Sequence, residues 1–268
     1  SMESTQMSWF PMLFAGMVIS SVQAQKGRIV GIVTGTIRPS CQMGQLVVRD
    51  EKERLEQYVQ SIRSLIEAEA FKKIVFAENS NYGCDALEGL QIAADEHQVE
   101  LECLSFQGNT EQACIHGKGY GEGEIMDYVF RHSQLLKNEP YFVKITGRLQ
   151  IDNITAIAAR LKKTRTYFNI PNKTKREIYD TRIYGMPVKQ FEEDFLKEYG
   201  HVMDGQGIYL EHVYTKILKK CGIKVYNFPL YPRIRGISGS GGAIYGYTEW
   251  KCKIKDLLSK VNFYKVKG

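Results

Sequence analysis

Apolar and polar positions follow two different periods along this chain, and the changes of period predict its elements. Short apolar runs at 27–36, 73–77 and 100–106 predict buried strands. Between them, over 50–70 and 86–94, apolar residues recur every three or four positions, as on one face of a helix. The order strand, helix, strand, helix, strand predicts a parallel sheet with right-handed crossovers.

A further strand is predicted over 141–145, and the candidate site is organised around it. Lys144 interrupts its apolar run, and a lysine in a buried strand is rare unless it is paired or serves a ligand. Thr146, Gly147 and Arg148 follow at the carboxyl end, the edge of an open α/β sheet where ligands bind. A lysine that reaches solvent beside a surface arginine is the alternative.

The second half of the chain predicts elements in a less regular order. They are helices at 153–161, 188–199 and 207–221 and strands at 177–184 and 224–230. Asp180 and Arg182 are two residues apart in a predicted strand and therefore share a face. The whole pattern predicts a single α/β domain over 27–249, with a Rossmann-like mixed, mostly parallel sheet flanked by helices.

The two ends of the chain differ from this domain. Residues 1–26 include an apolar run, but Glu3 stands where a secretion signal carries a lysine or arginine, and the run is too short to span a bilayer. We therefore favour a buried or interfacial segment over a secretion signal for these residues. Residues 250–268 carry six lysines among apolar residues. They predict a basic amphipathic tail that docks on the domain or rests on an anionic membrane.

The net charge limits the kinds of partner that the protein could bind, and the cysteines limit its metal sites and its cellular compartment. The formal net charge of +6 over 268 residues favours anionic partners such as nucleotides or a membrane surface, but it is too modest to predict nucleic-acid binding. The six cysteines show no metal-ligand spacing. We therefore expect reduced, mostly buried thiols and no zinc site in a cytoplasmic protein, with peripheral contact to the inner face of the membrane as a further expectation.

A glycine-rich stretch at 116–124 contains Lys118 and precedes a helix predicted at 123–133. It matches neither a Walker A loop nor a dinucleotide fingerprint. Backbone that can approach a ligand closely, a lysine and a helix N-terminus together suit a phosphate. A flexible surface loop is the alternative.

Two other polar stretches suit parts of a nucleotide. Glu78, Asn79, Ser80 and Asn81 follow a predicted strand and suit a base or ribose pocket, although Asx turns alone would explain them. Residues 233–242 combine two arginines, two serines and four glycines, which predicts an anion-binding lid.

Seven short motifs occur in order after residue 27: Thr34-Gly35-Thr36, Glu78-Asn79-Ser80-Asn81, Ser105-Phe106-Gln107-Gly108-Asn109, Gly117-Lys118-Gly119-Tyr120-Gly121-Glu122, Lys144-Ile145-Thr146-Gly147-Arg148, Tyr209-Leu210-Glu211-His212 and Gly236-Ile237-Ser238-Gly239-Ser240. Together they resemble bacterial surface-polysaccharide glycosyltransferases of the GT-A type, found in capsule and O-antigen loci. The fourth and fifth motifs carry most of the resemblance.

The resemblance implies a GT-A-like fold and transfer of a sugar from a nucleotide-sugar donor to a glycan or lipid-linked glycan acceptor. It implies donor contacts from five of the seven motifs and from two neighbouring stretches: Thr34, Gly35, Thr36, Glu78, Asn79, Ser80, Lys118, Gly119, Tyr120, Gly121, Glu122, Thr146, Gly147, Asp180, Arg182, Arg233, Arg235, Ser238 and Ser240.

The chain departs from the wider GT-A pattern at the metal-binding motif. Those enzymes hold Mg²⁺ or Mn²⁺ with an Asp-x-Asp motif after the central strand, whereas this chain has Thr146-Gly147-Arg148 there and no Asp-x-Asp anywhere. Protein cations can stabilise a diphosphate leaving group instead, and Lys144 with Arg148 are the catalytic candidates for this role. We expect no cofactor; a divalent Mg²⁺ or Mn²⁺ held by Asp180 or Asp152 is the alternative.

The acceptor hydroxyl needs a general base if transfer inverts the anomeric centre. Glu211, beside His212 on a predicted helix, is the first candidate, and Asp204 on a glycine-flanked loop is the second. Two other functions remain open. One is a sugar nucleotidyltransferase, which would normally carry a glycine-rich loop with arginine and lysine after its first strand. The other is a non-catalytic nucleotide- or glycan-binding protein.

Overall fold

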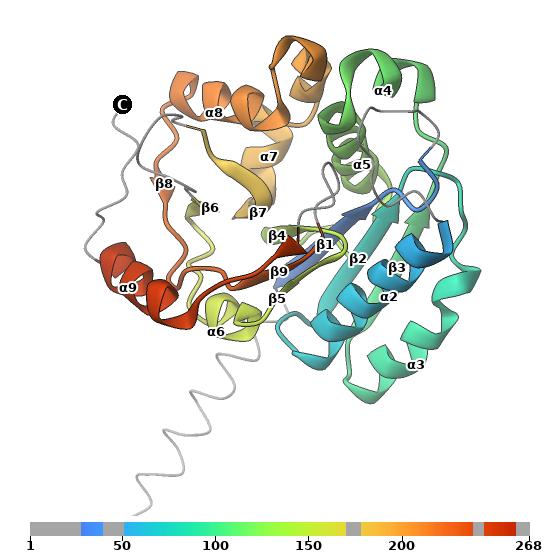
Figure 1. The fold of residues 1–268 in the computed structure, drawn as a ribbon, viewed down its shortest axis with the longest axis horizontal. Coiled ribbons are helices and arrows are strands. Elements are labelled where there is room, and N and C mark those ends of the chain that lie inside the picture. Colours follow the sequence, from blue (N-terminus) through green and yellow to red (C-terminus); the bar gives the residue numbers. More distant parts are fainter. Residues whose placement is uncertain (1–27, 40–50, 170–177, 238–243, 261–268) are drawn as a thin grey trace, which may run out of the picture.

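A seven-stranded mixed sheet forms the centre of the molecule (Figure 1). The computed structural model describes residues 28–39, 51–169, 178–237 and 244–260. Strands β1 (Ile29–Gly35), β2 (Lys73–Glu78), β3 (Glu100–Ser105) and β4 (Tyr141–Thr146) are parallel and lie in the order β3-β2-β1-β4. Next to β4 comes the antiparallel strand β7 (Asp180–Pro187), followed by β6 (Thr166–Asn169) and β8 (Val225–Tyr226). The predicted mixed, mostly parallel sheet is confirmed.

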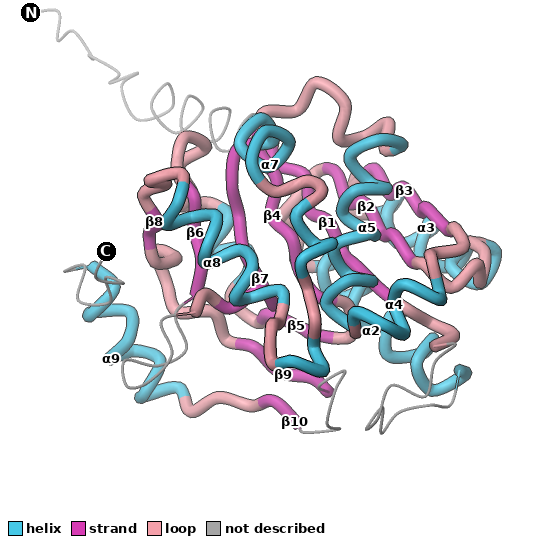
Figure 2. The backbone as a smooth tube through the Cα atoms, turned by 90° about the horizontal axis from the view of Figure 1, so that it is seen from above, coloured by secondary structure: helices cyan, strands magenta, loops and turns pink. Residues whose placement is uncertain are grey.

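Helices cover both faces of this sheet (Figure 2). On one face lie α2 (Glu51–Glu67) and α3 (Glu88–Glu96), and on the other lie α5 (Lys118–His132), α7 (Val188–Asp194) and α8 (Leu210–Lys220). Side chains alternate along a strand, so Ile29 and Val33 of β1 join the core under α2, while Val30 and Ile32 join the core under α5. Each face therefore has its own apolar core.

Shorter elements connect these layers. They are α4 (Thr110–His116), α6 (Ile154–Ala158) and the 3₁₀ turns η1 (Asp85–Leu87), η2 (Glu198–His201) and η3 (Asp204–Gln206). A three-stranded sheet, not predicted from the sequence, joins β5 (Leu149–Ile151), β9 (Ile234–Ile237) and β10 (Ile244–Tyr245) in the order β10-β9-β5. The predicted lid at 233–242 therefore begins as a paired strand, and 238–243 lie outside the described residues.

The glycine run at 117–123 is almost wholly helical, so the prediction of a loop at this position is wrong. Helix α5 begins at Lys118, which leaves only Gly117 outside it, at φ +106°. The other glycines are sites of close packing: a Cβ on Gly123 would lie 2.1 Å from the Cβ of Tyr199, and one on Gly119 would lie 3.1 Å from the Cβ of Leu210. These glycines let α5 approach η2 and α8.

The expectation of reduced thiols is wrong for three of the five cysteines that the structure describes. Cys84 and Cys103 form a disulfide across 19 residues, linking the segment after β2 to β3, and Cys114 is also disulfide-bonded. Cys221 and Cys252 are free. Sequence spacing did not reveal the pair because parallel strand pairing, rather than a local motif, brings the two residues together. Disulfides of this kind are typical of oxidising compartments.

The predicted basic tail is a helix as far as the structure describes it. Helix α9 (Glu249–Lys260) docks on the domain through buried Cys252 and through Asp256, which pairs with Arg233. Residues 1–26 and 261–268 lie outside the described residues. Within the described part of the chain, no helix has both the length and the apolar character that crossing a bilayer requires.

Candidate functional site

The loops after four parallel strands meet at one edge of the sheet and line a cavity of about 510 Å³, here called the first cavity. They contribute Thr34 to Thr36 at the end of β1, Asn79 to Asn81 after β2, Gln107 to Asn109 after β3, and Thr146 to Arg148 at the end of β4. Strand β7 runs antiparallel to β4, so its first residues reach the same edge. Several of the predicted donor-binding motifs are therefore brought together, at the edge where α/β sheets bind ligands.

Hydrogen bonds between neighbouring loops fix the polar wall of the first cavity. The Thr36 hydroxyl donates to Asn79 Oδ1 at 2.7 Å, and the backbone N–H of Arg38 donates to Ser80 Oγ at 3.0 Å. Glu78 lies behind this wall, fully buried, and accepts bonds from Ser80 N at 2.8 Å and Tyr82 N at 2.7 Å. Glu78 therefore shapes the loop and does not line the cavity.

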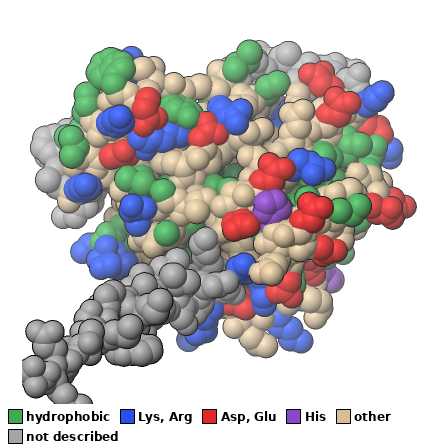
Figure 3. All heavy atoms as spheres, turned by 90° about the horizontal axis from the view of Figure 1, so that it is seen from below, with side chains coloured by type: hydrophobic (Ala, Val, Ile, Leu, Met, Phe, Trp, Pro, Cys, Tyr) green, Lys and Arg blue, Asp and Glu red, His purple; other side chains and the backbone are tan. Residues whose placement is uncertain are grey.

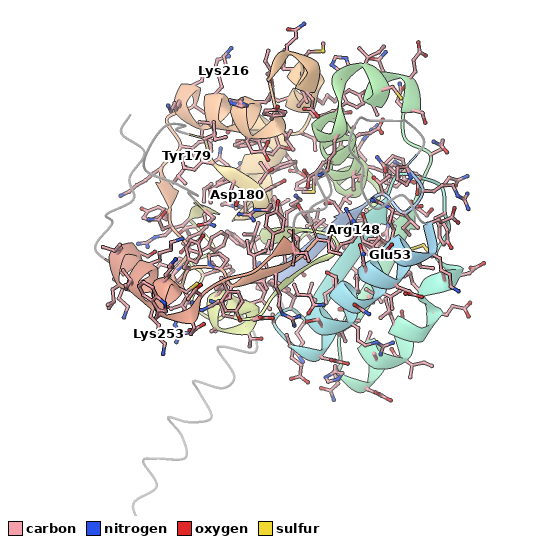
Figure 4. All side chains as sticks on the ribbon, in the orientation of Figure 1. Glu53, Arg148, Tyr179, Asp180, Lys216 and Lys253 are labelled. Atoms are coloured by element: carbon pink, nitrogen blue, oxygen red, sulfur yellow. A yellow bond between two sulfur atoms is a disulfide. The ribbon has the colours of Figure 1, made fainter. Side chains whose placement is uncertain are left out.

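Arg148 brings a buried and incompletely paired cation to the first cavity (Figure 4). Its side chain is 6% exposed, its Nη1 donates to Gln57 Oε1 at 3.1 Å, and its Nε has no partner among the described residues. The backbone of Arg148 is left-handed, at φ +66°. Strained backbone and an unsatisfied buried polar group are both features that cluster at ligand sites.

Gly147 makes this turn by close contact with β1. Its N–H donates to Thr34 O at 2.9 Å, and a Cβ here would lie 2.3 Å from the Tyr58 ring. Only glycine fits between Tyr58 and Thr34. The position is therefore structural, and it holds Arg148 against the cavity.

Arg54 of α2 adds a second buried cation to the first cavity. It is 3% exposed and donates from Nε to Thr36 O at 3.0 Å. Burial lowers the pKa of Arg54, and the charge of Arg148 lowers it further. The signal that could have identified it is its spacing, because Arg54 precedes the core residue Tyr58 by four positions and shares its helix face.

Lys118 stands at the N-terminus of α5 and lines two cavities. Its backbone N–H donates to Asp204 Oδ2 at 2.8 Å, so Asp204 caps α5 from a distant turn and lies outside both cavities. Burial of the ammonium lowers the pKa of Lys118, and Arg148 lowers it further, while Glu122 and Glu211 oppose both effects. A helix N-terminus with a lysine suits an anion.

Lys144 is fully buried and holds Glu122 rather than lining a cavity. Its ammonium forms an ion pair with Glu122 and donates to Thr146 Oγ1 at 2.8 Å and Thr181 O at 2.7 Å. These three bonds use its three donors. Burial alone would raise the pKa of Glu122, but Lys144 and Lys118 outweigh it and the pKa is lowered. Glu122 is therefore a carboxylate fixed between the two cavities.

A second cavity of about 370 Å³ shares Lys118, Glu122 and Thr146 with the first. Its other lining residues include Asp180 and Arg182 of β7, which form the expected pair on one strand face. Tyr179, Tyr209 and Tyr245 add aromatic rings. Figure 4 labels Tyr179 and Asp180 at the start of β7. Carboxylates, an arginine and tyrosines suit a polyhydroxylated ligand.

Glu211 lines the second cavity in the first turn of α8. It accepts a hydrogen bond from Thr181 Oγ1 at 2.9 Å. Burial raises the pKa of Glu211 above its ordinary value, and the nearby charges of Glu122 and Asp180 raise it further, against the Thr181 bond. A carboxylate with a raised pKa that faces a cavity is a candidate for general acid–base chemistry.

Several residues predicted to contact the donor lie elsewhere. Arg233 pairs with Glu249 and Asp256, and Arg235 pairs with Asp152; neither arginine lines either cavity. The remaining cases are Gly119 and Tyr120, which pack α5 away from the two cavities, and Ser238 and Ser240, which lie outside the described residues.

The carboxylates considered as metal ligands are each paired with an arginine, Asp180 with Arg182 and Asp152 with Arg235. Among the described residues, no three His, Cys, Asp or Glu side chains are grouped as a metal site requires. Four positive side chains line the first cavity instead: Arg54, Lys118 and Arg148, and the exposed Arg38, which pairs with Glu51.

Comparison with known proteins gives no family for this chain. No protein-family model and no curated protein sequence matches it. Solved structures that resemble it include a Desulfovibrio desulfuricans protein assigned as a nucleotide-diphospho-sugar transferase, with a TM-score of 0.46 and 10% identity over 75% of this chain and 80% of that one. A Vibrio cholerae nucleoside-diphosphate-sugar pyrophosphorylase has a TM-score of 0.42 and 10% identity over 75% of this chain and 91% of that one. A Leptospira borgpetersenii cytidylyltransferase has a TM-score of 0.42 and 9% identity over 90% of this chain and 100% of that one. We draw no functional inference from likeness at this level.

Proposed function

We propose that this protein is a glycosyltransferase that moves a sugar from a nucleotide-sugar donor to a glycan or lipid-linked glycan acceptor. The observation that carries the proposal is the pair of adjacent cavities that share Lys118, Glu122 and Thr146. The first has polar loops and cations, and the second has tyrosines and a carboxylate with a raised pKa. Sugar transfer needs one pocket for each substrate, with the reacting sugar where the pockets meet.

The nucleotide occupies the first cavity. Thr36, Asn79 and Ser80 belong to the wall that surrounds the base and ribose. The diphosphate lies against Arg148 and Lys118, and the N-terminus of α5 points its positive end at the same region. Because a charged donor bonds strongly to phosphate oxygens, the incomplete pairing of Arg148 is satisfied when the diphosphate binds.

Protein cations stabilise the nucleoside diphosphate as it leaves. Lys118 lines both cavities, which puts its ammonium beside the bond that breaks. Arg148 remains charged throughout, because a guanidinium does not lose its proton in proteins. Lys144 acts as a positioning residue through Glu122. On this proposal no divalent metal is needed, and adding EDTA leaves the rate unchanged.

Glu211 serves as the general base. It removes the proton from the acceptor hydroxyl in the second cavity as that oxygen attacks the anomeric carbon and the bond to the diphosphate breaks. A base with a raised pKa is better matched to a hydroxyl proton than an ordinary carboxylate. Asp204 is disfavoured in this role, since it caps α5 and lines neither cavity.

The experiment has a binding step and a turnover step. Thermal shift with UDP-, GDP- and CMP-sugars identifies the donor, and mass spectrometry then measures donor hydrolysis and transfer. Glu211→Gln should retain the shift and lose about 10²- to 10⁴-fold in kcat. The control is Glu193→Gln, an exposed glutamate on α7. Stabilisation by none of the nucleotide sugars would contradict the proposal.

A sugar nucleotidyltransferase is the second candidate, because the four cationic side chains that line the first cavity would also suit a triphosphate. Its nucleophile is an ionised phosphate oxygen, which needs no general base, so Glu211→Gln would then have little effect. Pyrophosphate release from a nucleoside triphosphate and a sugar 1-phosphate would favour this candidate. Donor binding without turnover in either assay would favour a non-catalytic binding protein.

A further inference from the structure

Exposed apolar side chains gather on the C-terminal arm, defined here as residues 244–260. In the described part of the chain, five of the nine exposed large hydrophobic residues belong to it: Ile244, Tyr247, Trp250, Ile254 and Leu257. Trp250 is 60% exposed and Leu257 is 63% exposed. Scattered exposed hydrophobic residues are ordinary, but a contiguous group marks an interaction surface.

Three of these residues form one stripe on α9. Trp250, Ile254 and Leu257 are spaced four and three positions apart, so they lie one above another on the helix surface. The opposite side of α9 holds the helix on the domain, where Cys252 is buried and Asp256 accepts a bond from Tyr231 N at 2.7 Å. The apolar stripe therefore points away from the domain.

Lysines border this stripe on both sides. At 100° per residue, Lys253 and Lys260 fall on one side of it, and Lys251 falls on the other. Lys255 lies farther round the helix, where its ammonium packs over the Tyr231 ring. In the view from below, hydrophobic and basic side chains lie side by side over the region of α9 (Figure 3). Lysine is depleted at protein–protein interfaces, whereas a tryptophan and aliphatic stripe between lysines is typical of helices that lie in the surface of an anionic bilayer.

We propose that the C-terminal arm docks on an anionic lipid bilayer, with α9 parallel to the membrane surface. Trp250, Ile254 and Leu257 enter the boundary between headgroups and acyl chains, and the flanking lysines contact lipid phosphates. Each lysine near such a surface strengthens binding about fivefold, which corresponds to about 1 kcal/mol. Insertion of the apolar stripe and attraction of the lysines to lipid phosphates together suit reversible, salt-sensitive attachment.

The arm also adjoins the second cavity. Tyr245 of β10 lines that cavity, while its neighbour Ile244 is 84% exposed and points the other way, as side chains alternate along a strand. Docking therefore brings the second cavity close to the lipid surface. This step rests on the proposed function, for which it selects a lipid-linked acceptor; membrane binding by itself does not depend on turnover.

The test is co-sedimentation of the full chain with vesicles of phosphatidylcholine alone or with one quarter phosphatidylglycerol. We expect pelleting with the anionic vesicles only, and loss of pelleting at 0.5 M salt, where screening shortens to a few ångströms. The double variant Ile254→Glu, Leu257→Glu should lose binding. Lys253→Glu with Lys260→Glu should weaken it at least about 25-fold by the same fivefold effect of each lysine. The control is Ile92→Glu on α3, which is also exposed.

Circular dichroism confirms that each variant is folded, and donor-induced thermal shift reports the first cavity separately. No pelleting of the wild-type chain overturns the proposal, as does equal loss in the Ile92→Glu control or equal binding to neutral vesicles. A chain that is dimeric in light scattering and becomes monomeric in the Ile254→Glu, Leu257→Glu variant would also overturn it, because a second copy would then cover the stripe.

Discussion

The glycine positions of α5 provide a graded test of how closely the helices pack. Alanine in place of a helical glycine normally stabilises by up to about 1 kcal/mol. At Gly123, however, the new Cβ would lie 2.1 Å from the Cβ and 2.6 Å from the Cγ of Tyr199. The Cβ of Tyr199 is fixed by the backbone and cannot move away unless η2 moves, and overpacking of this kind costs about 1–3 kcal/mol. We expect Gly123→Ala to lower the free energy of unfolding by up to about 2 kcal/mol, the difference between these two effects.

Gly89 and Gly121 give two reference substitutions against which the effect of Gly123→Ala on stability is compared. At Gly89 in α3 nothing lies within 4 Å of a new Cβ, so Gly89→Ala should be stabilising. At Gly121 the single close atom is Asn79 Nδ2 at 3.1 Å, so Gly121→Ala should fall between the other two. Urea unfolding followed by circular dichroism gives the three midpoints, compared at unchanged m-value. A midpoint for Gly123→Ala at or above that of Gly89→Ala would refute this account of the packing.

Three further predictions concern buried charge and the disulfide. Arg148→Gln should leave the melting temperature of the ligand-free protein unchanged or raised, because an incompletely paired buried cation is removed. The affinity for the nucleotide sugar, measured by calorimetry, should fall about tenfold or more. A lower melting temperature would show that Arg148 is structural. Replacing Cys84 and Cys103 together by alanine should lower the free energy of unfolding by about 3 kcal/mol, because the unfolded chain is then no longer cross-linked. The urea midpoint should fall accordingly, and an unchanged midpoint would show that the disulfide does not stabilise the fold. Glu122→Gln should cost about 3–5 kcal/mol by leaving Lys144 buried without its partner. The folded-state pKa of Glu122 is lowered, so the ion pair contributes its full stabilisation above the unfolded-state pKa of about 4.3. This stabilisation is lost as the pH falls through the folded-state pKa, so the difference in stability between wild type and variant should close in acid. A difference independent of pH would contradict the ion pair.

The sequence predicted the central sheet and the location of the site, but not which side chains face it. Apolar runs identified β1, β2, β3 and β4, and the polar residues after them meet at one edge as expected for parallel strands. Lys144 was recognised as unusual, yet its role depended on a partner from α5, 22 residues away. Sequence periodicity does not report contacts between elements.

The glycine run shows a second limit. Glycines at alternate positions fit either a ligand-binding loop or a helix packed closely against its neighbours, and only the presence of Tyr199 and Leu210 decides between them. For the same reason the buried position of Arg54 and the Cys84–Cys103 pair depended on tertiary structure. The small sheet of β5, β9 and β10 was missed because its strands are two to four residues long.

The residues shared by the two cavities have a consequence for the order of events. Lys118 and Glu122 line both cavities, so a charge placed in one changes the electrostatic potential in the other. A diphosphate beside Lys118 would neutralise the cation that now opposes the raised pKa of Glu211, and the affinity of Glu211 for a proton would increase. By thermodynamic linkage, donor binding and proton uptake then favour each other. On the proposed function, the acceptor would therefore meet a stronger base when the donor is already bound. Proton uptake on donor binding, measured by calorimetry in buffers of different ionisation enthalpy, would report this coupling directly.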